Sequence, residues 1–312
     1  MQNVVVVGCG GGVAALYRVA RNWGLRPIGL GASCKNSESP HHHVTWSTHS
    51  GDVDFVARLL RERFGRVDAL WSRTSGPAIV AHADLASTLG IRGPADFFAR
   101  ACYDLTGLRE LARAIGVQVL PMITIKNLRE IEAREHEIDW PVVLKPHASK
   151  QGKAHVHLCE TLSDAGRALP EVLANSHDSL AVVEPYSPGQ EYAFFSIWSG
   201  SKEIKSCVLA DTADLGTDGV TTSGYVATRS PKPVVEMLDQ FRDYLSRTGA
   251  FGTHAFTLRL QPQGPILTEV GYGAGGDDVL ESGLLGSDSQ SWLDAELAVT
   301  LGMDDVGANS NG

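Results

Sequence analysis

The stretch Trp140-Pro-Val-Val-Leu-Lys145-Pro146 places a lysine at the end of an apolar run with the composition of a buried strand. Burying an ammonium group is costly unless an anion meets it, so this lysine indicates a bound anion such as a phosphate. The polar residues that follow include Lys150, Gly152 and Lys153, which suit a loop that folds over phosphates. The alternative is an edge strand whose lysine reaches out to water.

A second segment carries two acids around a turn. Ala181-Val-Val-Glu184-Pro185-Tyr186 is followed by Gly189-Gln-Glu191. A strand that ends in an acid, then a turn and another acid, suits the recognition of an adenine edge and a ribose hydroxyl. The alternative is an ordinary strand–loop–strand.

A third segment carries a carboxylate beside glycines. Pro265-Ile-Leu-Thr-Glu269-Val270 leads into a glycine-rich stretch, residues 271–276, and then into Asp277 and Asp278. This arrangement suits a Mg²⁺ ion that holds phosphate oxygens. For the two aspartates the alternative is the N-terminal cap of a helix over residues 279–285.

The first hundred residues alternate short apolar runs with amphipathic stretches, which predicts a parallel sheet covered by helices on both faces. We expect strands at residues 3–7, 26–30 and 69–71, and helices at 13–23, 54–64, 79–89 and 97–115. The region after Pro121 mixes antiparallel strands with helices and is predicted to be α+β. Its expected strands are 140–145, 180–184, 192–198, 204–209, 256–260 and 265–270, and its expected helices are 162–174 and 234–247.

A glycine-rich stretch, Gly8-Cys-Gly-Gly-Gly12, lies between the first strand and the first helix, where a dinucleotide loop would lie. Val13 stands where a small residue permits close packing, and no acid follows the second strand to hold a ribose hydroxyl. We therefore prefer a glycine-rich turn, and an NAD(P)-linked oxidoreductase ranks last among the functions considered.

Taken together, the three segments resemble the ATP-grasp superfamily in order and spacing, in particular carboxylate–amine ligases related to carbamoyl-phosphate synthase and amino-acid ligases. Residues 104–121, with Arg109 and Gly116, look like the helix and exit turn that open the nucleotide region of that family. The resemblance implies an α/β domain over residues 1–100 and an α+β ATP-grasp domain over 101–305, with a smaller lobe at about 122–188. A flexible tail is expected over 306–312.

The resemblance also implies roles for individual residues. Lys145 and Lys150 would hold phosphates, Glu184 and Tyr186 the adenine, and Glu191 the ribose. ATP and Mg²⁺ are the implied cofactors, with Glu269 and Asp277 as metal ligands.

Four departures from the family pattern remove charge or metal-ligand groups where phosphoryl transfer needs them: Leu105, Thr257, Gly271 and Gly273. Arg259, two residues beyond Thr257 and therefore on the same strand face, is the preferred replacement cation. Lys153 is a second candidate, and a surface arginine at position 259 is the alternative.

Other polar residues were weighed for a role. Residues 211–229 form a long irregular stretch whose candidate substrate contacts are Ser223, Tyr225 and Arg229, although a merely flexible loop explains it equally well. His41-His42-His43 is interpreted as a solvated loop in preference to a metal cluster. His254 is either a base or, more commonly for such a residue, a buried histidine.

Composition excludes several classes of protein. The 312 residues carry a net charge of −9, which argues against a general nucleic-acid binder, and no apolar run is long enough to cross a membrane. The start of the chain lacks the features of a signal peptide, so a cytoplasmic protein is expected. We predict an ATP-dependent ligase that joins a small carboxylate, an amino acid by preference, to an amine, with a homodimer as a possible assembly. The alternative is a degenerate ATP-grasp protein that binds a nucleotide or metabolite without catalysis.

Overall fold

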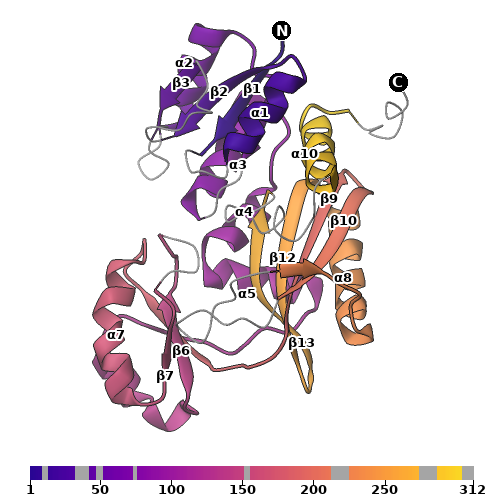
Figure 1. Cartoon of the computed structure of the whole chain (residues 1–312). Coiled ribbons are helices and arrows are strands. Elements are labelled where there is room, and N and C mark those ends of the chain that lie inside the picture. Colours follow the sequence, from indigo (N-terminus) through magenta and orange to yellow (C-terminus); the bar gives the residue numbers. More distant parts are fainter. Residues whose placement is uncertain are drawn as a thin grey trace.

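The computed structural model describes residues 1–8, 13–31, 42–46, 52–72, 76–150, 155–211, 225–273 and 287–303, without the side chains of 287–289. These residues form one parallel sheet and two antiparallel sheets, with helices packed against them (Figure 1). The expected combination of a parallel sheet with antiparallel sheets is therefore confirmed. No helix within these ranges is both long enough and apolar enough to cross a membrane.

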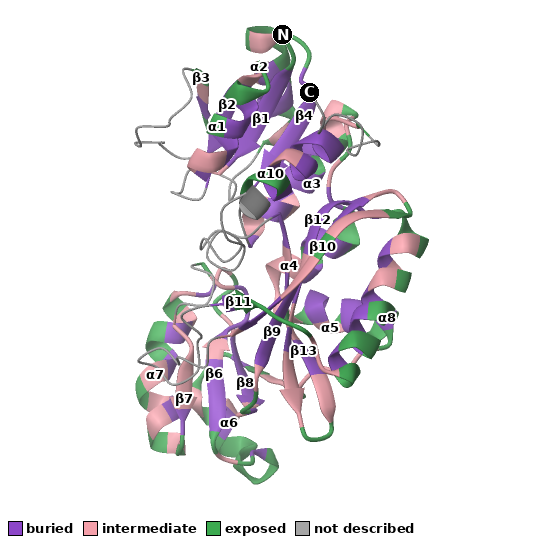
Figure 2. Cartoon of the chain, turned by 45° about the vertical axis from the view of Figure 1, so that its right-hand side comes forward, coloured by how far each residue is buried: buried purple, intermediate pink, exposed green. Residues whose placement is uncertain are grey.

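The parallel sheet lies at the start of the chain. Its strands, in spatial order, are β3 (His42–Thr45), β2 (Arg26–Gly31), β1 (Asn3–Val7) and β4 (Ala69–Ser72). Strand β1 is buried along its whole length (Figure 2) because helices cover both faces of the sheet. One face packs on α2 (Val53–Phe64) and α3 (Pro77–Leu89), and the other on α1 (Ala14–Asn22) and α10 (Ser287–Thr300).

The expected loop after the second strand is wrong for two of its histidines. His42 and His43 belong to β3, where they pair with Ile28 and Gly29 of β2. The backbone hydrogen bonds of the sheet outweigh the polar character of these side chains, which remain exposed or half-exposed. His41 lies outside the described residues.

The larger antiparallel sheet has five strands. Their spatial order is β11 (Tyr225–Ala227), β10 (Lys202–Asp211), β9 (Glu191–Ser199), β12 (Phe251–Gln261) and β13 (Gly264–Tyr272). One face packs on α4 (Asp96–Tyr103), α5 (Leu105–Ile115) and α8 (Lys232–Thr248) through a large apolar core. Helix α10 covers part of the opposite face with Trp292, leaving the ends of the strands beyond it for polar side chains.

The single helix expected over residues 97–115 is wrong, because the chain breaks at Asp104 into α4 and α5. Asp104 has extended backbone angles, and its carboxylate accepts a hydrogen bond of 2.7 Å from the amide of Gly107, which caps α5. A Cβ at Gly107 would lie 2.7 Å from the carbonyl oxygen of Arg100, so the two helices approach very closely there. Helical periodicity continues through this break, which the cap at Asp104 and the close contact at Gly107 mark.

The smaller antiparallel sheet forms a separate layer beside α5 (Figure 1). Its strands are β5 (Ile123–Ile125), β8 (Ala181–Pro185), β6 (Val142–Pro146) and β7 (His157–Cys159). Helices α6 (Leu128–Ala133) and α7 (Leu162–Ala174), with the short helix η2 (Glu135–Glu137), complete this part. It has its own apolar core, and residues 117–122 and 186–190 connect it to the rest of the chain.

Candidate active site

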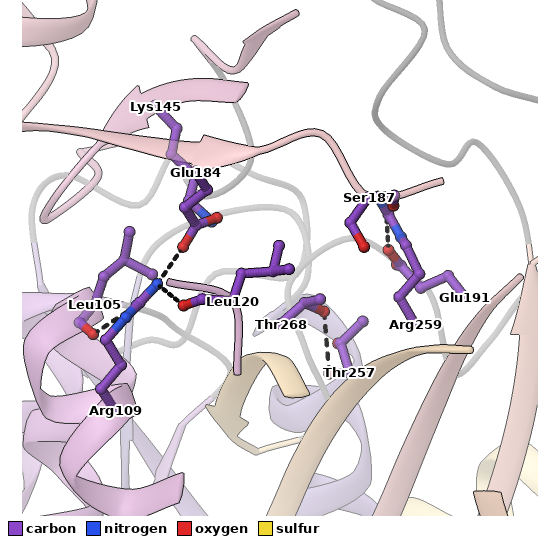
Figure 3. Close-up of polar contacts among 10 residues, drawn as sticks. All are labelled: Leu105, Arg109, Leu120, Lys145, Glu184, Ser187, Glu191, Thr257, Arg259 and Thr268. Carbon is purple, nitrogen blue, oxygen red and sulfur yellow. Dashed lines mark hydrogen bonds and ion pairs between the residues drawn. The ribbon is translucent and has the colours of Figure 1, made fainter. Parts of the chain in front are cut away.

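Glu184, near the end of β8, binds two cations with one carboxylate (Figure 3). Its Oε2 lies 2.6 Å from the Nζ of Lys145 on the neighbouring strand β6, and its Oε1 lies 2.5 Å from the Nη2 of Arg109 on α5. Arg109 also donates to the carbonyls of Leu105 and Leu120. Burial by itself would raise the pKa of Glu184, yet the two cations hold that pKa below its usual value. Two cations and one carboxylate leave a net positive charge, which suits an anion.

A second polar group lies at the start of β9. The Nη2 of Arg259 donates to Oε2 of Glu191 at 2.9 Å, and the phenol of Tyr225 donates to Oε1 of the same carboxylate. Arg259 also donates to the carbonyl of Ser187 at 3.1 Å. The register pairs Arg259 directly with Glu191, so both side chains lie on one face of the five-stranded sheet. The charge of Arg259 is therefore already balanced by a buried carboxylate.

The carboxylate expected to bind magnesium lies further along the same sheet face. Glu269 on β13 is exposed and pairs directly with Thr257 on β12. A bulge follows, and there the hydroxyl of Thr268 donates to the carbonyl of Thr257 at 3.0 Å. Arg259 is two residues from Thr257 on the same strand. The pairing thus brings a neutral hydroxyl, not a second carboxylate, beside Glu269.

The donor set around Glu269 fits a magnesium ion only if a ligand supplies further oxygens. Within the described ranges no group of three or more histidine, cysteine or carboxylate side chains is arranged to hold a metal. Mg²⁺ beside phosphates is commonly bound through one or two carboxylates together with phosphate oxygens and water. Glu269 supplies the one carboxylate that such a phosphate-bound ion needs. Asp277 and Asp278 lie outside the described residues.

A narrow gap separates the ion-paired Glu184 and Arg109 from Thr268 on β13. A small cavity of about 10 Å³, enough for roughly one water molecule, lies between α5, β8 and β13. Arg109 and Glu184 line one side, and Thr268, the chain neighbour of Glu269, lines the other (Figure 3). A larger hollow of about 430 Å³ lies between α2 and α3 and contains none of the predicted site residues.

The connection between the small and the large antiparallel sheets is tightly built. Gly189 has a φ of +145°, and a Cβ there would lie 2.2 Å from the carbonyl oxygen of Leu260. The amide of Leu260 donates to the carbonyl of Gln190 at 2.9 Å, and the side chain of Gln261 donates to the carbonyl of Pro188. Residues 186–190 therefore run in direct contact with the end of β12.

The other predicted residues are scattered. Lys150 donates from Nζ to the carbonyl of Ala174 at the end of α7, Tyr186 is half-buried, and Arg229 is exposed. Lys153 and Ser223 lie outside the described part of the chain. His254 is buried on the opposite face of β12, and burial lowers its pKa to about 4, in agreement with the buried-histidine interpretation.

Sequence reasoning missed three residues that contact one another: Thr106, His147 and Asp178. Arg109 was recognised only as a landmark of its helix. The signal for Arg109 was its place one turn into the helix that resembles the opening of the family's nucleotide region, where a cation is an electrostatic partner for nearby acids. For the other three residues the sequence offers no signal, because Thr106 and Asp178 lie 41 and 31 residues from His147, the residue that they both contact.

Comparison with known proteins supports the fold. No protein-family model and no curated protein matches the chain. An L-amino acid ligase from Bacillus licheniformis has a similar structure, with a TM-score of 0.72, 18% identity and coverage of 89% of this chain and 68% of that one. An N5-carboxyaminoimidazole synthetase from Staphylococcus aureus complexed with ADP gives a TM-score of 0.73 at 12% identity, covering 96% and 77% of the two chains.

A third similar structure is the biotin carboxylase domain of the 2-oxoglutarate carboxylase from Hydrogenobacter thermophilus, in complex with MgADP, ADP and bicarbonate. Its TM-score is 0.72 at 13% identity, with coverage of 96% of this chain and 70% of that one. The chain therefore has the ATP-grasp fold, and the resemblance noted in the sequence is confirmed at the level of the fold.

Proposed function

We propose that this protein is an ATP- and Mg²⁺-dependent ligase that activates a small carboxylate for attack by an amine. One observation carries the proposal: in an ATP-grasp fold, the cationic group around Glu184 lies across a small cavity from Thr268, the chain neighbour of Glu269. The name of one similar structure, an L-amino acid ligase, supports an amino acid as the carboxylate, and the ADP and MgADP complexes of the other two support the nucleotide and the metal.

Each residue has a distinct part in this proposal. When bound, ATP supplies the phosphoryl group that activates the carboxylate. Lys145 balances phosphate charge, while Glu184 orients the ammonium of Lys145 through the ion pair. Glu269 holds Mg²⁺ together with phosphate oxygens, and the small sheet shields the reacting carboxylate from water. Asp277, Lys150 and Lys153 are proposed as additional ligands of the metal and the phosphates.

The ion pairs modify the expected nucleotide contacts. Both oxygens of Glu184 are engaged by cations, so we assign recognition of the adenine edge to the connection that contains Tyr186. Glu191 is engaged by Tyr225 and Arg259, so a ribose hydroxyl would have to share that carboxylate with them. Arg259, together with Ser223 and Arg229, is proposed to contact the substrate.

The test is binding of ADP with and without Mg²⁺, followed by ATP turnover with mixtures of amino acids. We expect the native protein to bind ADP, and Lys145→Met to weaken that binding by at least about tenfold because a charge-assisted contact is lost. Lys202→Met, at an exposed lysine on β10, is the matched control and should bind like the native protein. A native protein that binds neither ADP nor ATP would contradict the proposal.

A second candidate function is nucleotide binding without phosphoryl transfer. It is supported by Thr257, which brings no carboxylate beside Glu269, and by the apolar Leu105 at the start of α5. Glu269→Gln distinguishes the two functions. If the protein is a ligase, this variant should lose ATP turnover. If the protein only binds a nucleotide, the native protein shows no turnover, and the variant keeps its nucleotide affinity nearly intact.

A further inference from the structure

The smaller antiparallel sheet contacts α5 at a second polar site, next to the Arg109–Glu184 pair. We propose that His147, held by Asp178 and bonded to Thr106, is a positioning residue that docks this sheet onto the start of α5 and thereby sets the place of Lys145. This inference rests on the proposed function only where it links the position of Lys145 to the affinity for a nucleotide.

Every polar group of His147 is engaged. Its Nδ1 lies 2.5 Å from Oδ2 of Asp178, and its Nε2 lies 2.9 Å from the hydroxyl oxygen of Thr106. Its amide donates to the carbonyl of Leu180 at 3.0 Å, and its carbonyl accepts from the amide of Leu105 at 3.2 Å. The residue is buried. It thus connects the segment before β8 with the first turn of α5.

Asp178 is itself fixed as an anion. Its Oδ1 accepts hydrogen bonds from the hydroxyl of Ser176 at 2.7 Å and the amide of Leu180 at 3.1 Å. Burial opposes ionisation, but these donors and His147 hold the pKa of Asp178 below its usual value. An ionised Asp178 orients the imidazole with its Nδ1 proton toward the carboxylate. Nε2 is then directed to Thr106.

The contact survives in both protonation states of His147. In the neutral ring Nε2 accepts a hydrogen bond from the hydroxyl of Thr106, and in the charged ring Nε2 donates to the same oxygen. In each case Nδ1 keeps its proton and donates it in the hydrogen bond to the carboxylate of Asp178. The hydrogen bonds that join Asp178, His147 and Thr106 therefore form with either form of the ring.

The three side chains have the order of a hydroxyl, a base and an acid, but the surroundings do not favour a nucleophile. A reacting hydroxyl requires nearby N–H donors for the developing oxyanion. At the start of α5 the amide of Leu105 is bound to the carbonyl of His147, and that of Gly107 to the carboxylate of Asp104. The geometry therefore favours positioning over covalent chemistry.

The position of this contact explains why it bears on Lys145. His147 follows Lys145 by two residues, and Thr106 precedes Arg109 by three residues, less than one helical turn. The small sheet is thus joined to α5 at two adjacent points. The apolar core beneath the small sheet and the one around α5 share no described residue, so these polar contacts contribute directly to the docking. Without the contact at Thr106, the backbone hydrogen bond from Leu105 to His147 and the Arg109–Glu184 pair would be left to hold the orientation of α5 against the small sheet.

The experiment compares Thr106→Val, which loses the hydroxyl at nearly constant volume, with Thr106→Ser, which retains it. Thr106 is exposed, so the thermal midpoint should change little in either variant. We expect faster amide hydrogen exchange at Leu105 and in residues 145–149 of the nucleotide-free Val variant. We also expect about fivefold weaker binding of ADP with Mg²⁺, as for one lost hydrogen bond, and recovery of both properties in the Ser variant.

A second variant tests the same contact without changing a residue in the first turn of α5. Asp178→Asn should weaken ADP binding as well, and the double variant with Thr106→Val should be no worse than the more affected single variant, because the residues act as one unit. Unchanged hydrogen exchange in Thr106→Val, or a Ser variant no better than Val, overturns the proposal. If exchange responds as expected but the native protein binds no ADP, the docking contact stands and the ATP-dependent function fails.

Discussion

Lys145 and Glu184 lie diagonally across the neighbouring strands β6 and β8, and their side chains form an ion pair of 2.6 Å. The register of the small sheet alone brings them together, since Lys145 pairs with Val182 and Glu184 with Val143. Both side chains are largely buried, so removing Glu184 would leave Lys145 as a largely buried charge without this counter-ion. The pair prepares a cation for an incoming anion while keeping it paired in the absence of one.

Replacement of Glu184 by glutamine should destabilise the protein by about 3 kcal/mol, because Lys145 and Arg109 lose their shared counter-ion. Pyrophosphate should then raise the thermal midpoint of Glu184→Gln more than that of the native protein, because the anion replaces the carboxylate. Thermal unfolding with and without pyrophosphate measures both effects, and Glu135→Gln at an exposed position is the control. Equal stabilisation of the two proteins would argue against an anion site here.

Introduction of a second carboxylate opposite Glu269 should strengthen metal binding. Thr257→Glu places an acid directly across from Glu269 on the same sheet face. We expect the Mg²⁺ concentration needed for half-maximal ADP binding to fall by about tenfold, because two carboxylates hold the ion more tightly than one. Thr257→Gln, with the same size and no charge, should leave that concentration unchanged. A similar effect of both variants would place the metal elsewhere.

Gly189→Ala should cost about 2 to 3 kcal/mol of stability, because its positive φ and the contact with the carbonyl of Leu260 leave no room for a methyl group. Gly200→Ala is the matched control, since Gly200 also has a positive φ but no atom lies within 4 Å of a Cβ there. Its cost should be about 1 kcal/mol. Urea unfolding distinguishes the two variants, and equal costs would mean that the connection at Gly189 adapts.

Stability should fall with acidification between about pH 6.5 and pH 4. Burial lowers the pKa of both His82 and His254 to about 4, so the folded state binds fewer protons than the unfolded state in that window. The unfolding free energy must then rise with pH across it, by up to about 3 kcal/mol for each histidine. His254→Phe should make the dependence shallower, whereas His136→Gln at an exposed position should not. Unfolding free energies measured at several pH values test this, and an unchanged slope in His254→Phe would contradict it.

Much of the fold follows from short-range patterns. The β-branched run of β1, the helix over Leu162–Ala174 with its Thr161 cap, and the turn at Gly200 depend on residues close together in the chain, so periodicity and turn chemistry predict them. The short strand β3 has no such pattern, because an edge strand exposes most of its side chains. The break between α4 and α5 depends on the cap at Asp104 and on the close approach of Gly107 to Arg100. The spacing of apolar residues shows neither of them.

The sequence by itself determined that Lys145 and Glu184 lie next to the ends of two largely buried strands, where a charge requires a partner. Which partner each charge has was decided by tertiary structure. Glu184 contacts Lys145 and Arg109, Glu191 contacts Arg259 and Tyr225, and Thr106 and Asp178 contact His147. These pairs are separated by 31 to 75 residues, and only sheet register and the docking of α5 bring them within hydrogen-bonding distance.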